Sequence, residues 1–222
     1  MAPPSTPDKW PSAEMFGKTL TVHVGAARKR PFSLHHGVLS FYSGYFEAAV
    51  KATFKERKQG VIELPTEDVK ILELLVRWLY TRQLPTGPGG GYAVFDPLCQ
   101  LCLFVDRRDI PLLANMAING VREEVIRTST APIHHLNNIY DNTTESAGLR
   151  RFCVYLISHM SGASILQETL RCEYPAEALW DILRVVWTLD NRMNPPVTIS
   201  ALATSRLCAY HTHEKGVECP QT

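Results

Sequence analysis

The stretch from residue 74 to residue 81, Leu-Leu-Val-Arg-Trp-Leu-Tyr-Thr, decides the fold of this 222-residue chain. It continues an apolar pattern of helical period that begins at Val69 and places large apolar side chains on two stripes. Two apolar stripes are typical of a helix that is buried on more than one side, so the pattern predicts a central helix. Thr66 is expected to cap this helix, with Glu67 and Asp68 in the first turn, where the helix dipole favours negative charge. The stripes are Val69, Leu72, Leu75, Val76 and Leu79, and Ile71, Leu74 and Trp78.

Three short strands are predicted before this helix. Residues 20–24 alternate apolar and polar side chains and end at Gly25, as a half-buried strand does. Residues 31–34 form the returning strand after a short turn. Residues 61–64, which Pro65 ends, form the third strand. No other segment of the chain has a convincing strand pattern.

Helical period dominates the remainder of the chain. Ser43 is expected to cap a helix from Tyr45 to Phe54. Further helices are expected from Asp96-Pro97, from a cap at Asp109, over residues 132–140 and 149–160, and after Pro175, where the apolar residues are Leu179, Ile182, Leu183 and Val186. The fold class is therefore α+β and mostly α, with a small three-stranded sheet capped by helices and followed by an all-helical extension.

The composition is that of a globular protein. Apolar residues make up 45% of the chain and charged residues 20%, which is too apolar for a disordered chain. Lys and Arg total 23 against 22 Asp and Glu, so no net field attracts phosphate backbones or acidic membranes. The sequence has neither a secretory signal nor an apolar run of the ~18 residues that span a membrane. We therefore expect an intracellular protein, cytoplasmic or nuclear, whose six cysteines are reduced and mostly buried.

Short segments between Thr19 and Val125 resemble the BTB/POZ domain family, in the family's order and spacing. These segments are residues 20–25, Phe32-Ser33-Leu34-His35-His36, Leu39 with Ser43, Tyr45 and Phe46, Phe54-Lys55-Glu56, Ile62-Glu63-Leu64, residues 74–81 and residues 106–113. The region from Ile139 to Arg151 is similar to the helical extension that follows the domain in many fungal members. The resemblance implies a BTB/POZ-like fold in a protein of the fungal type.

The chain departs from the family pattern at positions that concern dimerisation more than the fold. Lys18 or Thr19 stands where the family has an aspartate, His36 where it has a lysine, and Arg82 where it has a glycine. The N-terminal segment that many members exchange between subunits is not evident in the Pro-rich residues 1–13. We expect a disordered tail, a BTB/POZ domain, a helical extension and a polar C-terminal tail at residues 1–17, 18–128, 129–206 and 207–222.

The sequence contains no pattern of convergent catalytic residues, so the protein is not expected to be an enzyme. Cys99 and Cys102 have the spacing of a redox motif, but they fall inside an apolar helix and are expected to be core thiols. His35, at a strand-to-helix junction, is expected to be a core residue that bonds to the backbone and caps the helix. His134 and His135 are expected to lie in solvent.

Four residues with the chemistry of zinc ligands lie close together near the C-terminus: Cys208, His211, His213 and Cys219. Thiolate and imidazole groups suit tetrahedral zinc. The spacing is nevertheless tighter than in a zinc finger, and an unstructured tail is the simpler interpretation, so no metal or cofactor is assigned. The alternative function is that of a transcription-related regulatory protein with a metal-binding tail.

The resemblance implies a non-enzymatic protein–protein interaction module that acts in oligomerisation or as a scaffold or adaptor. Some family members are adaptors for cullin-based ubiquitin ligases and bind the cullin through a hydrophobic-x-acidic element. Phe54 and Glu56 stand at the matching position and are the candidate protein-binding residues. Alternatively, Phe54 packs inward, given its i+4 relation to Val50. The expected partners are proteins, either a second copy in a homodimer or a cullin scaffold.

Overall fold

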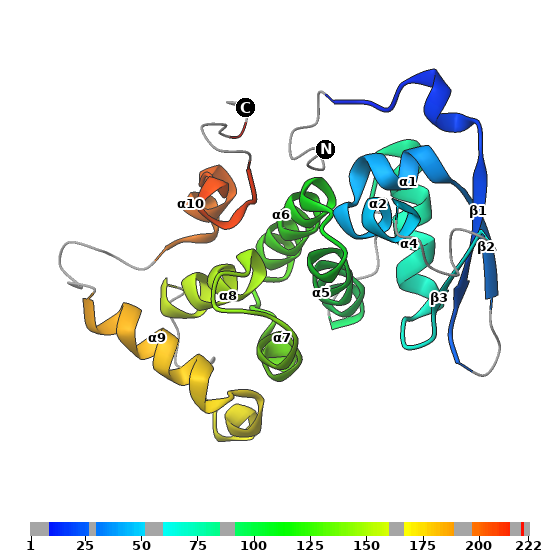
Figure 1. Cartoon of the computed structure of the whole chain (residues 1–222). Helices are drawn as coiled ribbons and strands as arrows, with labels where there is room; N and C mark the ends of the chain where they lie inside the picture. The colour runs from blue at the N-terminus through cyan, green and yellow to red at the C-terminus, as the bar shows by residue number, and fades with distance from the viewer. Residues whose placement is uncertain are drawn as a thin grey trace. The chain divides into compact units, whose positions relative to one another are not determined.

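The computed structural model describes residues 9–26, 30–51, 60–84, 92–159, 167–188, 197–213 and 219 (Figure 1). Contacts within the chain divide it into two compact units. The sheet unit comprises residues 1–86, 104–116 and 212–222, and the helical unit comprises residues 87–103 and 117–211. Each unit buries its own set of large apolar side chains.

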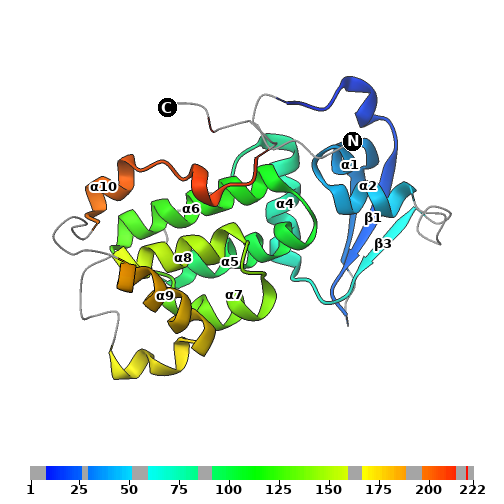
Figure 2. The ribbon, with the colours of Figure 1, turned by 60° about the vertical axis from the view of Figure 1, so that its left-hand side comes forward.

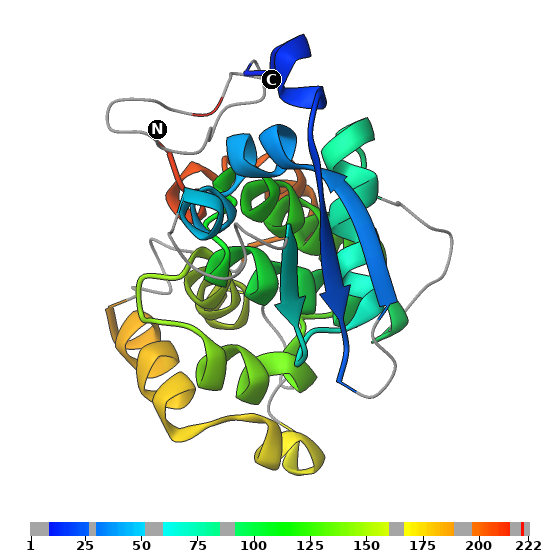
Figure 3. The same ribbon diagram turned by 45° about the vertical axis from the view of Figure 1, so that its right-hand side comes forward.

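Three strands form the mixed sheet of the sheet unit (Figure 3). β1 (Thr19–Val24) lies between β2 (Arg30–His35), to which it is antiparallel, and β3 (Val61–Leu64), to which it is parallel. Every second residue of β1 from Leu20 onward is buried, as the alternation predicts. Gly25 follows β1 with a φ of 87°, in the left-handed region that favours glycine. The predicted three-stranded sheet is confirmed.

Helices complete the core of the sheet unit. Among the described residues they include the α-helices α1 (His36–Tyr42), α2 (Gly44–Lys51) and α4 (Val69–Thr81). A single 3-10 turn, η1 (Ala13–Phe16), precedes β1 and has no buried residue. Members of both predicted stripes of α4 are buried, namely Ile71, Leu72, Leu75, Trp78 and Leu79. The central helix predicted from residues 74–81 is therefore confirmed.

The N-terminal cap of α4 differs from the prediction. Asp68, not Thr66, is the N-cap, because its carboxylate accepts a hydrogen bond of 2.7 Å from the backbone N–H of Lys70. Glu67 therefore precedes the helix and does not lie in its first turn. An aspartate and a threonine are both good caps, so the sequence alone does not separate the two positions.

The helical unit contains the start of α5 (Tyr92–Arg107), most of α6 (Pro111–Thr128), and the elements that follow (Figure 2). These are η2 (Ile133–His135), α7 (Leu136–Asn142), α8 (Gly148–His159), η4 (Glu168–Glu173), α9 (Ala176–Thr188), α10 (Ile199–Thr204) and η5 (Cys208–Tyr210). None of the described helices is both long and apolar enough to cross a membrane.

Two predicted helix starts are wrong. α5 begins at Tyr92 and contains Pro97, which the sequence placed at its start. The proline lies early in the helix, where its missing N–H costs one intrahelical hydrogen bond. α6 begins at Pro111, at the first helical position, which suits proline. Asp109 does not cap it, and takes a left-handed conformation with a φ of 48°.

The cysteines confirm one prediction and correct another. Cys99, Cys102 and Cys153 are buried, as expected of core thiols. Burial raises the pKa of Cys153 to about 12 and that of Cys99 well above its ordinary value, so neither thiol ionises near neutral pH. Cys172 is exposed, and the two C-terminal cysteines are partly exposed. The expectation that most of the six cysteines are buried is therefore wrong.

The C-terminal residues make specific contacts within the unit to which each belongs. In the helical unit, Leu207 is buried and the ring of Tyr210 lies 5.2 Å from the ring of Phe152. In the sheet unit, the side-chain amide of Asn115 exchanges hydrogen bonds of 2.9 and 2.8 Å with the backbone of Thr212. The polar composition of this segment did not indicate such packing.

Candidate protein-interaction surfaces

The predicted protein-binding residues Phe54 and Glu56 lie outside the described residues. The structure describes the chain up to Lys51, the last residue of α2, and again from Gly60, just before β3. Val50 and Gly60, which stand on either side of this interval, both line a cavity of about 600 Å³ in the sheet unit. The described residues that stand before and after the Phe54 segment therefore both line this cavity.

This cavity, which we call the α2–β3 groove, combines apolar and charged groups. Its lining includes Leu20, Ile62, Lys18, His36, Glu47 and Ser40, which come from β1 and the residue before it, β3, α1 and α2. The Ser40 hydroxyl is buried and has no hydrogen-bond partner among the described residues. The groove therefore presents apolar surface beside the charged side chains of Lys18 and Glu47.

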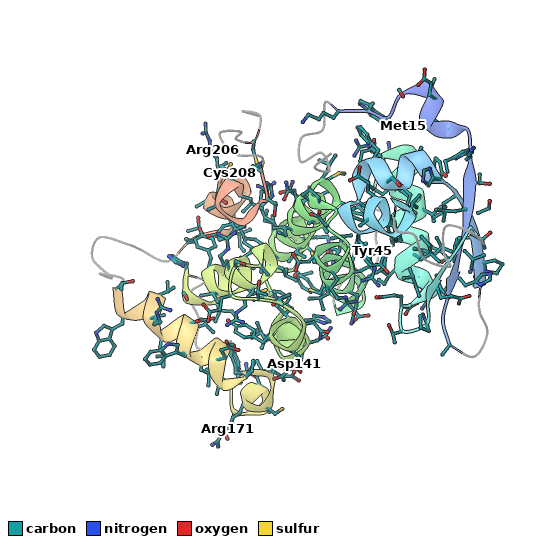
Figure 4. All side chains as sticks on the ribbon, viewed as in Figure 1. Met15, Tyr45, Asp141, Arg171, Arg206 and Cys208 are labelled. Carbon is teal, nitrogen blue, oxygen red and sulfur yellow. The ribbon has the colours of Figure 1, made fainter. Side chains whose placement is uncertain are left out.

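A second surface is the N-terminal aromatic patch, which we define as Trp10, Phe16 and Tyr80. These side chains are 61%, 42% and 40% exposed. η1 approaches α1 closely because Gly37 leaves room for it: a Cβ at Gly37 would lie 2.6 Å from the carbonyl oxygen of Met15, which is labelled in Figure 4. Exposed aromatic side chains on a packed scaffold are frequent at protein interfaces.

His35 connects two members of the patch. Its backbone N–H donates a hydrogen bond of 3.1 Å to the Tyr80 hydroxyl, and its Nδ1 lies 3.0 Å from the same oxygen. The imidazole also contacts Phe16 edge-on, with ring centroids 5.5 Å apart. His35 does occupy the N-cap position of α1, but its side chain makes no capping bond and is only half-buried. The prediction of a core histidine that caps the helix is therefore wrong, because the tyrosine hydroxyl binds the ring.

Arg82 closes α4 where the family pattern has a glycine. Its φ of 58° lies in the left-handed region, and its backbone N–H donates to the carbonyl oxygen of Trp78 at 2.8 Å. Glycine is favoured in this type of cap because other residues pay for the left-handed conformation. Arg82, which replaces the family glycine, therefore has a strained backbone conformation. Favourable contacts of its side chain must offset the free-energy cost of this strain.

The Arg82 guanidinium supplies this compensation by stacking on three aromatic rings. Its central carbon lies 4.1 Å from the ring centroid of Tyr42, 4.7 Å from that of Trp78 and 4.9 Å from that of Trp10. One guanidinium N–H also donates to the carbonyl oxygen of Lys9 at 3.0 Å. Burial raises the pKa of the Tyr42 phenol, and the nearby Arg82 charge opposes this rise. Arg82 therefore holds Trp10 and the N-terminal segment on the end of α4.

The segment from Ser43 to Phe46 is fixed by contacts that the sequence only partly predicted. Ser43 caps α2 as expected, since its Oγ accepts a bond of 3.1 Å from the N–H of Phe46. The same hydroxyl donates to the carbonyl oxygen of Arg108 at 2.6 Å. The Arg108 guanidinium stacks 4.7 Å from the Tyr45 ring centroid and bonds to Glu67 at 2.8 Å (Figure 4 labels Tyr45). The role of Glu67 was missed because its partner is distant in sequence.

The four candidate zinc ligands fall in different units. His213 and Cys219 belong to the sheet unit, where the Cys219 thiol lies 3.3 Å from Nε2 of His213. Cys208 and His211 belong to the helical unit, where Nε2 of His211 lies 3.1 Å from the Asn119 side-chain oxygen. The His213–Cys219 pair supplies two of the four ligands that structural zinc requires. A complete zinc site stays the alternative interpretation of these four residues.

The two neighbouring histidines that end η2 differ from each other. His134 is exposed, and its Nδ1 lies 3.0 Å from the carboxylate of Glu173. The His135 side chain is only 13% exposed and lies 3.8 Å from Asp96. Burial lowers the pKa of His135, while Asp96 opposes this shift. The prediction that both histidines lie in solvent is wrong for His135.

The comparison with protein families gives a match that agrees with this geometry. The model of the BTB/POZ domain matches residues 14–92, which run from η1 through the three strands and α4 to the first residue of α5. No curated protein matches the chain.

Proposed function

Since residues 14–92 form a BTB/POZ domain, we propose that the protein is a non-enzymatic interaction module that associates with a second copy of itself. Domains of this family generally mediate protein–protein interaction or oligomerisation. The observation that best supports the proposal is the exposure of the N-terminal aromatic patch, in which Trp10 is 61% exposed. Aromatic side chains of this kind supply much of the binding energy at protein interfaces.

Light scattering of the full chain tests this proposal through Trp10→Asp and Phe16→Asp. Each substitution places a charge on the patch, and each is expected to remove one association step. Ser33→Asp, at an exposed position of β2, is the matched control and is expected to associate like the wild type. Equal masses for the wild type and both patch variants at every concentration would show that the patch is not an interface.

We infer an adaptor role for a cullin-based ubiquitin ligase as a second candidate function. The supporting observation is the α2–β3 groove, because it borders the segment that contains Phe54 and Glu56. In this role the aromatic ring and the carboxylate bind the cullin, and residues 131–222 bind the substrate. The same segment could not bind a cullin if Phe54 packed against Val50.

A pull-down with a cullin N-terminal domain tests the adaptor role. Phe54→Ala and Glu56→Ala are each expected to reduce binding at least tenfold, in line with the cost of losing an interface anchor. Gln59→Ala, in the same segment, is the control and is expected to bind normally. Binding by both variants at the wild-type level would refute the adaptor role and leave self-association untouched.

A further inference from the structure

The inward face of α9 is firmly attached to the helical unit. Ala178 and Ile182 are buried, and α9 packs against α8 and α7 (Figure 2). Asp181 accepts hydrogen bonds of 3.0 Å from both the Arg150 guanidinium and the Tyr140 hydroxyl. Arg150 is itself buried. This polar cluster fixes the rotation of α9 about its axis, and with it the residues that face outward.

The outward face of α9 is apolar. We define the α9 outer face as Leu179, Trp180, Leu183, Val186 and Trp187, which are 40%, 64%, 56%, 45% and 90% exposed. The sequence grouped Leu179, Leu183 and Val186 with Ile182 as the apolar residues of this helix, yet only Ile182 is buried. The face also lies outside residues 14–92, so the BTB/POZ domain does not account for it.

The spacing on this face matches that of a helix-pairing seam. Ala176, Trp180, Leu183 and Trp187 follow one another at intervals of four, three and four residues, which is the a/d spacing of a coiled coil. This seam points away from Ala178 and Ile182, as an external interface requires. Leu179 and Val186 flank the seam on one side, and charged residues flank it on the other.

We propose that α9 pairs with α9 of a second copy of the chain, in antiparallel orientation about a two-fold axis between Asp181 and Ile182. In this arrangement Trp180 packs against Leu183 of the second copy. Trp187 packs against Ala176 of the second copy, so the largest side chain meets the smallest. Such an interface is self-complementary, as a two-fold axis demands.

Charge complementarity selects the antiparallel orientation. Glu177 and Arg184 lie on the same side of the seam, one near each end of it. Antiparallel pairing places Glu177 of each copy opposite Arg184 of the other, whereas parallel pairing places Arg184 beside the apolar Leu179. Glu177 bonds to Arg150 at 2.8 Å, yet its side chain remains 56% exposed and can accept a second bond.

The exposed area is sufficient for a reversible dimer. With ~250 Å² for a whole tryptophan side chain, the exposed fractions of the five residues correspond to roughly 600 Å² per copy. Stable interfaces bury about 800 Å² per partner. Residues at the rim of the seam supply the remaining buried area. The α9 interface therefore lies at the small end of the size range of stable interfaces. We therefore expect a dissociation constant on the order of micromolar.

Sedimentation velocity of the full chain, from about 1 to 200 µM, tests the pairing across the expected dissociation constant. The wild type is expected to form dimers as its concentration rises through this range. Trp187→Glu is expected to lack this association step. Trp187 is 90% exposed, so its substitution leaves the fold intact. Thr188→Glu adds the same charge one residue away, off the seam, and is expected to associate like the wild type. Identical sedimentation of the wild type and Trp187→Glu would overturn the proposal, as would an equal loss in Thr188→Glu.

Two further variants test the orientation. Arg184→Glu and Glu177→Arg each place like charges opposite one another and are expected to weaken the dimer about tenfold. An equimolar mixture of the two variants restores both ion pairs and is expected to associate more tightly than either alone. A mixture no tighter than the single variants contradicts antiparallel pairing. Trp10→Asp should leave the α9 step unchanged, so failure of this proposal and failure of self-association through the aromatic patch give different results.

Discussion

α4 and α9 are helices of 13 residues with similar apolar content and opposite surroundings. Trp78 of α4 is completely buried, whereas Trp187 of α9 is 90% exposed. Both helices have large apolar side chains at helical spacing, and both have charged residues between them. An apolar pattern therefore indicates that a face is to be covered, but it does not say whether the same chain or another one covers it.

The largest expected difference between the two helices is in stability. Trp78→Ala leaves a cavity in the core of the sheet unit and is expected to lower the free energy of unfolding by about 3–5 kcal/mol. Trp187→Ala is expected to change it by less than about 0.5 kcal/mol, since the side chain is exposed. Urea unfolding at low protein concentration, where α9 is unpaired, measures both. Similar losses in the two variants would mean that the α9 outer face is covered within its own chain.

A somewhat smaller effect is expected for the cluster that orients α9. Arg150→Ala removes the buried partner of Asp181 and is expected to destabilise the helical unit by about 3 kcal/mol. It should also abolish the α9 association step, because the outer face loses its fixed direction. Arg184→Ala, an exposed arginine on the same helix, serves as the stability control. If Arg150→Ala unfolds at the wild-type urea concentration, the cluster does not fix α9.

Arg82 offers a test at the end of α4 with an expected effect of about 1 kcal/mol. Arg82→Ala keeps the left-handed strain and loses the stacking on Tyr42, Trp78 and Trp10. Arg82→Gly loses the same stacking but relieves the strain, so it is expected to be more stable than Arg82→Ala by ~1 kcal/mol. Thermal unfolding compares the two. An alanine variant as stable as the glycine variant argues against a strained cap.

The smallest expected effect is a pH dependence in the helical unit. Burial lowers the folded-state pKa of His135 below its unfolded value, so the unfolded state binds the proton more readily. The stability contributed by neutral His135 is therefore present above the unfolded pKa and is lost as the pH falls through the folded pKa. Unfolding of His135→Asn at several pH values below 7 should show a smaller decline than the wild type. If His135→Asn loses as much stability as the wild type when the pH falls, the pH dependence comes from other groups.

The sequence predicted the local features of the sheet unit well. Alternation identified β1, and the two apolar stripes identified α4, because both patterns depend on neighbouring residues alone. Features that depend on distant residues were missed. His35 binds the hydroxyl of Tyr80, which comes from another element. Arg82 was noted only as a departure from the family glycine, and its strained conformation is visible only in the backbone.

The candidate interaction sites were likewise only partly predicted from the sequence. Resemblance to the family led to Phe54 and Glu56, which lie beside the α2–β3 groove in sequence but outside the described residues. The α9 outer face was missed because apolar periodicity is the same for a buried stripe and for an exposed one. The missing information was the direction of α9, which Asp181 and Arg150 determine through a contact between residues far apart in sequence.

The claim that this protein presents apolar surfaces to other chains is tested most directly by the mass of the full chain in solution. Light scattering across a range of concentrations should give a mass that rises above the 24.9 kDa of one chain, and Trp187→Glu should reduce that rise. A mass that stays at one chain for the wild type at every concentration would contradict the account.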